Sequence, residues 1–271
     1  MTAPDPADLL RLATELARAA GRLTLDMRAS ARLTPDSKSS VSDLVTAADR
    51  AAESLIVDGI LANRPDDAVL GEEGADIEGT SGVRWIIDPI DGTSNYVYDL
   101  PGYTISIAAE ADGVVVAGVV FDPKADELFA ASLGGGATMN GNELRCSERT
   151  ELDQCVIATG FGYGADQRLL QAKVLVHVLP ALGNIRRLGS AALDLAYVGA
   201  GRTDGYWETG LNAWDAAAGA LIAAEAGAVV TDLHGGSPSK AMTLATPPTI
   251  HARLQHLLQS AYDAELGNLA V

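Results

Sequence analysis

The first third of the chain combines helical periodicity with one apolar strand. Apolar residues recur at helical spacing over residues 9–27, and a second helical stretch runs from about residue 46 to residue 63, just before Pro65. The apolar, β-prone run at residues 83–87 ends at Asp88 and a following proline. We therefore expect two helices followed by a buried strand.

A hairpin and a mixed second half follow. Residues 104–110 and 114–121 are β-prone runs joined across Ala111-Asp112-Gly113, and Asp-Gly is a strong signal for a short antiparallel hairpin. Beyond residue 146, short apolar runs near Val156 and at residues 205–207 alternate with helix-like stretches at residues 167–179, 191–199 and 216–226. The pattern predicts an α/β chain with α+β layers. We expect a boundary in a short turn near residue 145, between subdomains at residues 1–145 and 146–271.

Net charge, apolar segments and cysteine content exclude several classes of function. The 271 residues carry 36 acidic and 19 basic side chains, a net charge of −17, which opposes binding to nucleic acid or anionic membranes. An anionic ligand would need another source of positive charge, such as metal ions. The apolar segments are too short to span a bilayer, and early charges argue against a signal peptide. Cys146 and Cys155 match no zinc pattern, so we expect free thiols in the reducing cytoplasm.

The most informative segment is Trp-Ile-Ile-Asp-Pro-Ile-Asp-Gly-Thr-Ser-Asn at residues 85–95. Asp88, Asp91 and the Ile90 carbonyl are hard oxygen ligands of the kind that Mg²⁺ prefers. Gly92 and the residues after it can present backbone N–H groups to an anion at a helix start. The same residue types are also common in ordinary turns and helix caps. This segment alone therefore leaves both interpretations open.

Two further acidic sites favour the metal interpretation. Glu72 and Glu73 lie between two glycines, and Asp215 follows Trp214 at the start of an Ala-rich helix. Taken singly, the first is typical of a solvated turn and the second of a helix cap. Three acidic sites at turns and element ends are what a metal-carboxylate cluster on a rigid scaffold requires. We expect them to meet in space.

The segments at residues 71–74, 85–95 and 214–219 resemble, in order and spacing, the three motifs of the inositol monophosphatase family. Lys38-Ser39-Ser40 and residues 43–49 give a fourth match, so the resemblance runs from about residue 8 to residue 232. It implies the αβαβα sandwich of inositol monophosphatases and sugar phosphatases. It also implies Mg²⁺-dependent hydrolysis of a phosphate monoester by direct attack of water, inhibition by Li⁺ and, commonly, a homodimer.

The resemblance also implies roles for individual residues. The metal ligands would be Glu72, Asp88, the Ile90 carbonyl, Asp91 and Asp215. Catalysis would use Glu72 to hold the attacking water, Thr93 to help activate it, and Asp49 to support Thr93 and a weaker metal site edged by Lys38. The substrate would be bound by Asp91, Gly92, Thr93, Gly189, Ser190, Ala191, Glu208 and Asp215. Ala213 departs from the family, where many relatives carry proline, and we expect a less rigid turn with metal binding intact.

The substrate and even the class of function have alternatives. The substrate could also be histidinol phosphate, fructose 1,6-bisphosphate or a 3′-phosphoadenosine nucleotide. The motif at residues 90–93, followed shortly by an aromatic residue, resembles that of inositol monophosphatases more than those of the phosphatases that act on these three substrates. A second alternative is a regulatory protein that keeps the fold and acts through partner contacts. Every expected metal ligand is present, which favours the enzyme. Residues 160–164 are glycine-rich without a dinucleotide fingerprint, so we interpret them as a loop near the rim of the active site.

Overall fold

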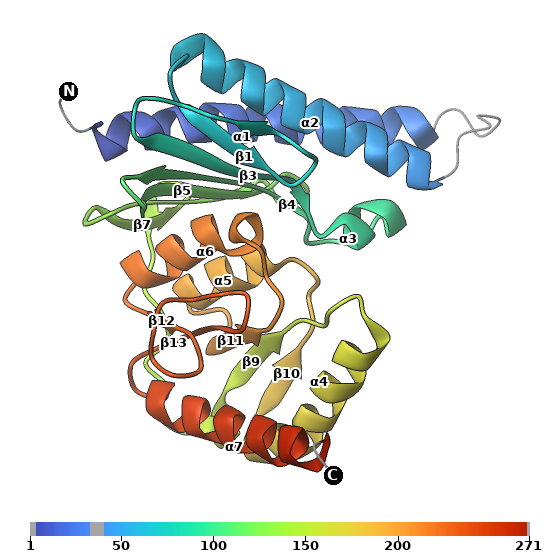
Figure 1. The fold of residues 1–271 in the computed structure, drawn as a ribbon, viewed down its shortest axis with the longest axis vertical. Coiled ribbons are helices and arrows are strands. Elements are labelled where there is room, and N and C mark those ends of the chain that lie inside the picture. The colour runs from blue at the N-terminus through green and yellow to red at the C-terminus, as the bar shows by residue number, and fades with distance from the viewer. Residues whose placement is uncertain (1–3, 33–40, 270–271) are drawn as a thin grey trace.

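The computed structural model describes residues 4–32 and 41–269, with side chains described for residues 4–30 and 47–266. Its elements stack as helix, sheet, helix, sheet and helix layers, from top to bottom in Figure 1. The predicted αβαβα sandwich is confirmed. Within the described ranges, no helix has both the length and the apolar character that crossing a membrane would require.

Two long helices cover the outer face of the first sheet (Figure 1). They are α1, Pro6–Arg32, and α2, Val41–Asn63. Ile56 of α2 packs with Trp85 and Ile107 of the sheet in one buried apolar cluster, which stabilises this layer. Both predicted helices are confirmed. Helix α1 extends beyond residues 9–27 at both ends, where its turns add little to the apolar periodicity.

The first sheet has eight strands in the order β2-β1-β3-β4-β5-β6-β7-β8. Their bounds are β1 Ala68–Gly71, β2 Asp76–Ile77, β3 Val83–Asp91, β4 Thr104–Ala111, β5 Val114–Asp122, β6 Glu127–Ser132, β7 Gly136–Met139 and β8 Asn142–Glu143. Among the strands described for residues 41–269, β1 and β3 are the parallel pair of this sheet, and its other neighbouring strands are antiparallel. The predicted hairpin is confirmed as β4 and β5, which turn at Asp112 and Gly113 with positive φ.

The central layer consists of α5, Ala191–Gly199, and α6, Ala213–Glu225. The two helices approach closely, because a Cβ on Gly219 would lie only 2.7 Å from the Cβ of Leu195. Ala218 of α6 belongs to the apolar cluster shared with the first sheet. The central helices thereby bring the C-terminal half of the chain onto the first sheet.

The second sheet has five strands in the order β10-β9-β11-β13-β12. Its strands are β9 Val156–Thr159, β10 Asn184–Arg186, β11 Gly205–Glu208, β12 Val229–Thr231 and β13 Thr243–Thr246. Helices α4, Ala165–Val178, and α7, His251–Leu269, cover this sheet. The described residues also form the short 3₁₀ helices η1, Leu152–Gln154, and η2, Leu179–Ala181. Of these strands the sequence pattern indicated β9 and β11, and the predicted helical stretch at residues 167–179 corresponds to α4. Strands β10 and β12 have three residues and β13 begins and ends with threonine, so none of them stands out as a separate apolar run.

The two sheets use different parts of the chain. The strands of the first sheet end at Glu143 and those of the second begin at Val156. Helices α5 and α6 nevertheless pack on the first sheet, so the halves share a core, and the boundary at residue 145 stays a prediction. Cys146 and Cys155 are both free, as expected.

Candidate active site

Strands β1 and β3 bring two acidic motifs to one edge of the first sheet. In their parallel register Gly71 lies opposite Ile87, so Glu72 and Asp88 follow at the same end of neighbouring strands. The Glu72 amide donates to the Ile87 carbonyl over 3.1 Å. The charge of Glu72 contributes to the raised pKa of Asp88, as expected for two carboxyl groups at the same end of neighbouring strands.

Strand β3 does not end at Asp88, as the apolar run predicts, but continues to Asp91. Its pairing with β4 is irregular between these two residues, where Pro89 has no N–H to donate. Asp88 Oδ1 accepts the Ile90 amide over 3.0 Å, and Thr93 Oγ1 donates to the Ile90 carbonyl over 3.3 Å. The irregular stretch therefore holds Asp88 and Asp91, which are 1% and 9% exposed, three residues apart.

Gly92 lies between the acidic motif and the turn of residues 189–191, for which the resemblance implies substrate binding. It precedes α3, Thr93–Tyr98, in the left-handed region at φ 89°. A Cβ at this position would lie 3.2 Å from the Gly189 carbonyl oxygen, so both conformation and space require glycine. Asn95 fixes this approach by donating from Nδ2 to the Leu188 carbonyl over 2.8 Å.

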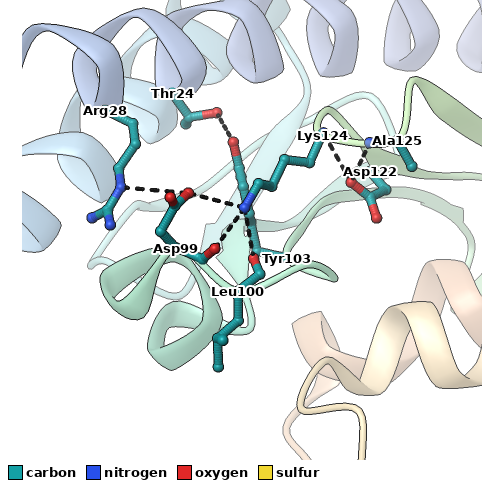
Figure 2. A network of polar contacts seen from close by, with 8 residues as sticks. All are labelled: Thr24, Arg28, Asp99, Leu100, Tyr103, Asp122, Lys124 and Ala125. Carbon is teal, nitrogen blue, oxygen red and sulfur yellow. Dashed lines mark hydrogen bonds and ion pairs between the residues drawn. The ribbon is translucent and has the colours of Figure 1, made fainter. Parts of the chain in front are cut away.

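The far end of α3 is held by a polar network outside the site (Figure 2). Lys124 Nζ donates to Asp99 Oδ1 over 2.9 Å, to the Asp99 carbonyl over 2.7 Å and to the Leu100 carbonyl over 3.3 Å. Arg28 of α1 lies 4.0 Å from the same carboxylate. Asp122 stabilises the Lys124 turn by accepting its backbone amide. The loop after α3 is therefore attached both to α1 and to the β5–β6 turn.

The central helices supply the remaining acidic groups. Asp91 Oδ2 accepts Ser190 Oγ over 2.6 Å and the Ala192 amide over 2.7 Å, which bonds the start of α5 to β3. The sequence predicts Asp215 at the start of the helix, but α6 begins two residues earlier, at Ala213. Asn212 is the N-cap, and the Asp215 carboxylate accepts the Asn212 amide over 2.6 Å from the third helical position. Cap residues before the apolar run shift the helix start to Ala213.

These groups meet in a cleft of about 200 Å³. Its lining contains the predicted metal and substrate residues: Glu72, Asp88, Ile90, Asp91, Gly92, Thr93, Gly189, Ser190, Ala191, Glu208 and Asp215. Asp49 is not part of the lining and lies behind it on α2, 4% exposed. Lys38, which the resemblance places at the edge of a metal site, falls outside the described residues.

The lining also contains residues to which the sequence assigned no catalytic or binding role. Residues 160–163 line the cleft, as expected for a loop at its rim, together with Gln167. Arg187 is the one basic side chain among the described lining residues. Asp194 also lines the cleft, although it is 2% exposed. The available signal for Asp194 was its position as the lone charged residue in the apolar helix α5.

Burial and crowding raise the pKa values of the acidic groups. Burial raises the pKa of Asp91 to about 7, and the charges of Asp215 and Glu72 add to this rise. Burial followed by the charge of Asp91 holds the pKa of Asp88 well above its ordinary value. Burial likewise raises the pKa of Glu72 and of Asp215. Behind the cleft, burial and then nearby glutamates raise the pKa of Asp49 to about 8. A cation would relieve this repulsion.

The donor set fits a hard divalent cation. The cleft offers carboxylate and carbonyl oxygens, and its described lining contains neither histidine nor cysteine. Among residues 4–30 and 47–266, no three His, Cys, Asp or Glu side chains are already drawn together as metal ligands. Several carboxylates instead accept local amides, so metal binding would require small movements toward a shared centre.

Comparisons with known proteins agree with this geometry. Residues 5–263 match the model of the inositol monophosphatase family. An inositol-1-monophosphatase of Rhizobium meliloti is 48% identical over 199 residues, 72% of this chain and 74% of that protein. The Nus factor SuhB of Escherichia coli K12 is 39% identical, with 94% and 98% covered. The solved structure of Mycobacterium tuberculosis SuhB is 41% identical, covers 95% and 98%, and superposes with a TM-score of 0.83. The chain belongs to the inositol monophosphatase family.

Proposed function

We propose that this phosphatase-family chain is a Mg²⁺-dependent hydrolase of inositol 1-phosphate or a closely related polyol phosphate. The observation that carries the proposal is a single cleft in which four carboxylates face a glycine turn and Glu208. Relatives named inositol-1-monophosphatase support the inositol ester as substrate.

The acidic side of the cleft would hold the metal. Its ligands would be Glu72, Asp88, the Ile90 carbonyl, Asp91 and Asp215. Bound Mg²⁺ neutralises phosphate oxygens, lowers the pKa of a water molecule and steadies the leaving alkoxide. Glu72 and Thr93 would orient the attacking water, and Gly92 would leave room for the phosphate. Asp49 would act from behind, through Thr93.

The other side would recognise the polyol. Glu208 faces the cleft with its Oε2 fixed by a 2.6 Å hydrogen bond from the Tyr206 hydroxyl. A Cβ on Gly160 would lie 1.8 Å from that oxygen, so glycine there makes room for the carboxylate. Glu208 would accept hydrogen bonds from substrate hydroxyls, next to the turn formed by Gly189, Ser190 and Ala191.

The first test is phosphate release from inositol 1-phosphate with and without Mg²⁺. We expect Mg²⁺-dependent release that Asp88→Asn lowers by roughly 10²-fold or more, because one ligand charge is lost. Histidinol phosphate, fructose 1,6-bisphosphate and a 3′-phosphoadenosine nucleotide are compared in parallel. A preference above about tenfold, or 1.4 kcal/mol, for one of these would replace inositol 1-phosphate as the substrate.

Asp122→Asn is the matched control. Asp122 is also a buried aspartate at the end of a strand, and its Oδ1 accepts the turn amides of Lys124 and Ala125 outside the cleft. We expect this variant to lose stability and keep its activity. Equal losses of activity in both variants, or a folded wild type that releases no phosphate, would contradict the proposal.

A second candidate function rests on the Escherichia coli relative, which is named a Nus factor. A role of this kind would act through partner contacts and would not need hydrolysis. The net charge of −17 makes a protein partner more suitable than nucleic acid. A strain whose only copy of the protein carries Asp91→Asn distinguishes the two functions. If this strain behaves like a deletion strain, the phosphatase is supported. If it behaves like the wild type, the partner role is supported.

The homodimer and the cytoplasmic location stay proposals. Large apolar side chains are exposed near the end of α3, at Tyr98 and Leu100, and on α4, at Leu169 and Val176. Burial of these side chains in a subunit interface would remove apolar surface from water. Sedimentation velocity would detect the dimer, and a monomer at all concentrations would argue against it. Li⁺ inhibition likewise stays a prediction, testable in the same release assay.

A further inference from the structure

Glu53 of α2 is a buried carboxylate directly behind the turn that carries Glu72. It is 8% exposed. Its Oε2 accepts the Glu73 amide over 3.0 Å, and its Oε1 accepts the Ala75 amide over 3.1 Å. Both oxygens therefore bond to backbone on either side of the same turn. Hydrogen bonds to an ionised carboxylate are stronger than those between neutral groups.

The same turn is attached on its other side to β3. The Gly71 amide donates to the Ala75 carbonyl over 2.7 Å, which closes the turn, and the Glu72 amide donates to the Ile87 carbonyl over 3.1 Å. These bonds fix the strand end of the turn. Glu53 fixes the part that faces α2, so the backbone on both sides of Glu72 is held.

The sequence at residue 71 is constrained by this carboxylate. A Cβ on Gly71 would lie 2.1 Å from Glu53 Oε2. Gly71 is not among the glycines with positive φ, so its backbone conformation would accept other residues. Space for the Glu53 side chain, and not the turn itself, is therefore the reason for glycine.

Glu53 is connected to the cleft through this turn. Its side chain contacts the residue on each side of Glu72, because it accepts the Glu73 amide and occupies the space beside the Gly71 Cα. Glu72 itself lines the cleft. A change in the Glu53 side chain would therefore move the backbone from which Glu72 reaches the cleft.

We propose that Glu53 is a positioning residue that presets Glu72 toward Asp88 for metal binding. The proposal rests on the proposed function, in which Glu72 is a metal ligand. A ligand held in place before the metal arrives loses less conformational freedom on binding. Groups that orient ligands from behind typically contribute about 10- to 100-fold in metal affinity.

The test measures Mn²⁺ binding without substrate, with free Mn²⁺ counted by electron paramagnetic resonance. Glu53→Gln keeps the size of the side chain and one acceptor, but it turns an N–H₂ group toward one of the turn amides. We expect its Mn²⁺ Kd to rise about tenfold. Glu53→Asp keeps the charge but is one methylene shorter, and we expect a similar rise. Normal affinity in Glu53→Asp would show that charge alone matters and would overturn positioning.

Glu225→Gln is the matched control. The Glu225 carboxylate also accepts two turn amides, those of Gly134 and Gly136, each over 2.8 Å, at a glycine turn away from the cleft. This variant should lose thermal stability without losing Mn²⁺ affinity. If Glu53→Gln binds Mn²⁺ within about twofold of the wild type, Glu53 only supports the fold and the inference is overturned.

Phosphate release separates this inference from the proposed function. In Glu53→Gln, activity should fall most at low Mg²⁺ and recover in part at saturating Mg²⁺. A wild type that binds Mn²⁺ but hydrolyses none of the four esters would contradict the proposed function alone, and the comparison of variants would still decide the role of Glu53. A wild type that binds no Mn²⁺ would contradict both.

Discussion

Asp91 links two distant parts of the chain through one carboxylate. Its Oδ2 accepts both Ser190 Oγ and the Ala192 amide, so β3 and α5 are joined at the centre of the cleft. Ser190 is at the same time the N-cap of α5, where its side chain accepts the Leu193 amide over 3.2 Å. One hydroxyl group therefore both caps a helix and orients a proposed metal ligand.

Ser190→Ala should remove both functions of that hydroxyl. We expect it to lower the free energy of unfolding by about 1–3 kcal/mol, because a cap and a hydrogen bond to a charged group are lost. It should also raise KM for inositol 1-phosphate. Ser147→Ala is the control, since Ser147 likewise donates to an aspartate, Asp204, outside the cleft. Urea unfolding and steady-state kinetics check the pair; equal KM values would contradict a role for Ser190 in the site.

At the scale of elements, helix α6 begins with cap chemistry that the apolar pattern does not contain. Asn212 and Asp215 form a capping box before the Ala-rich run, and the first helical residue is Ala213. This position tolerates proline well, since its N–H has no partner within the helix. The departure from the family at Ala213 therefore affects how firmly the Asp215 turn is held.

Ala213→Pro should stabilise the protein. Ala213 is exposed, and proline at the first helical position reduces the freedom of the unfolded chain. We expect the free energy of unfolding to rise by about 0.4–1 kcal/mol, measured by urea denaturation, with Mn²⁺ affinity unchanged. A destabilised variant would mean that the backbone before Trp214 cannot accept the fixed φ of proline.

At the scale of the whole molecule, the layered fold concentrates negative charge inside an already acidic protein. Two sheets and the central helices contribute carboxylates to one cleft, within a chain of net charge −17. The buried groups titrate far from their ordinary range: the pKa of Asp91 lies at about 7 and that of Asp49 at about 8, chiefly because of burial. Folding is therefore coupled to pH and to cations.

Without Mg²⁺, stability should fall as pH rises from about 5 to 8.5. The unfolded carboxyl groups lose their protons near pH 4, whereas the folded ones keep theirs until about pH 7 to 8. The folded state thus binds more protons in this window, and linkage makes the free energy of unfolding decrease with pH. Melting curves in EDTA check this, and Mg²⁺ should raise the melting temperature more at pH 8.5 than at pH 5. Asp91→Asn should flatten the dependence; a melting temperature that rises with pH would contradict it.

The sequence by itself determined the local features of this protein. Periodicity and Asp-Gly chemistry are properties of neighbouring residues, so the long helices and the β4–β5 hairpin could be predicted. The three acidic motifs indicated oxygen chemistry before any contact was known. The family resemblance predicted the layers, which the structure confirms, and roles for single residues, which stay proposals.

Only the tertiary structure decided which distant groups meet. The bond from Asp91 to Ser190 spans 99 positions, and the bond from Glu53 to the Glu73 amide spans 20. Neither follows from a local pattern, because such contacts depend on how whole elements pack. The same holds for the short strands, whose pairing depends on their neighbours, and for Asp194, which faces the cleft only because α5 lies between the two sheets.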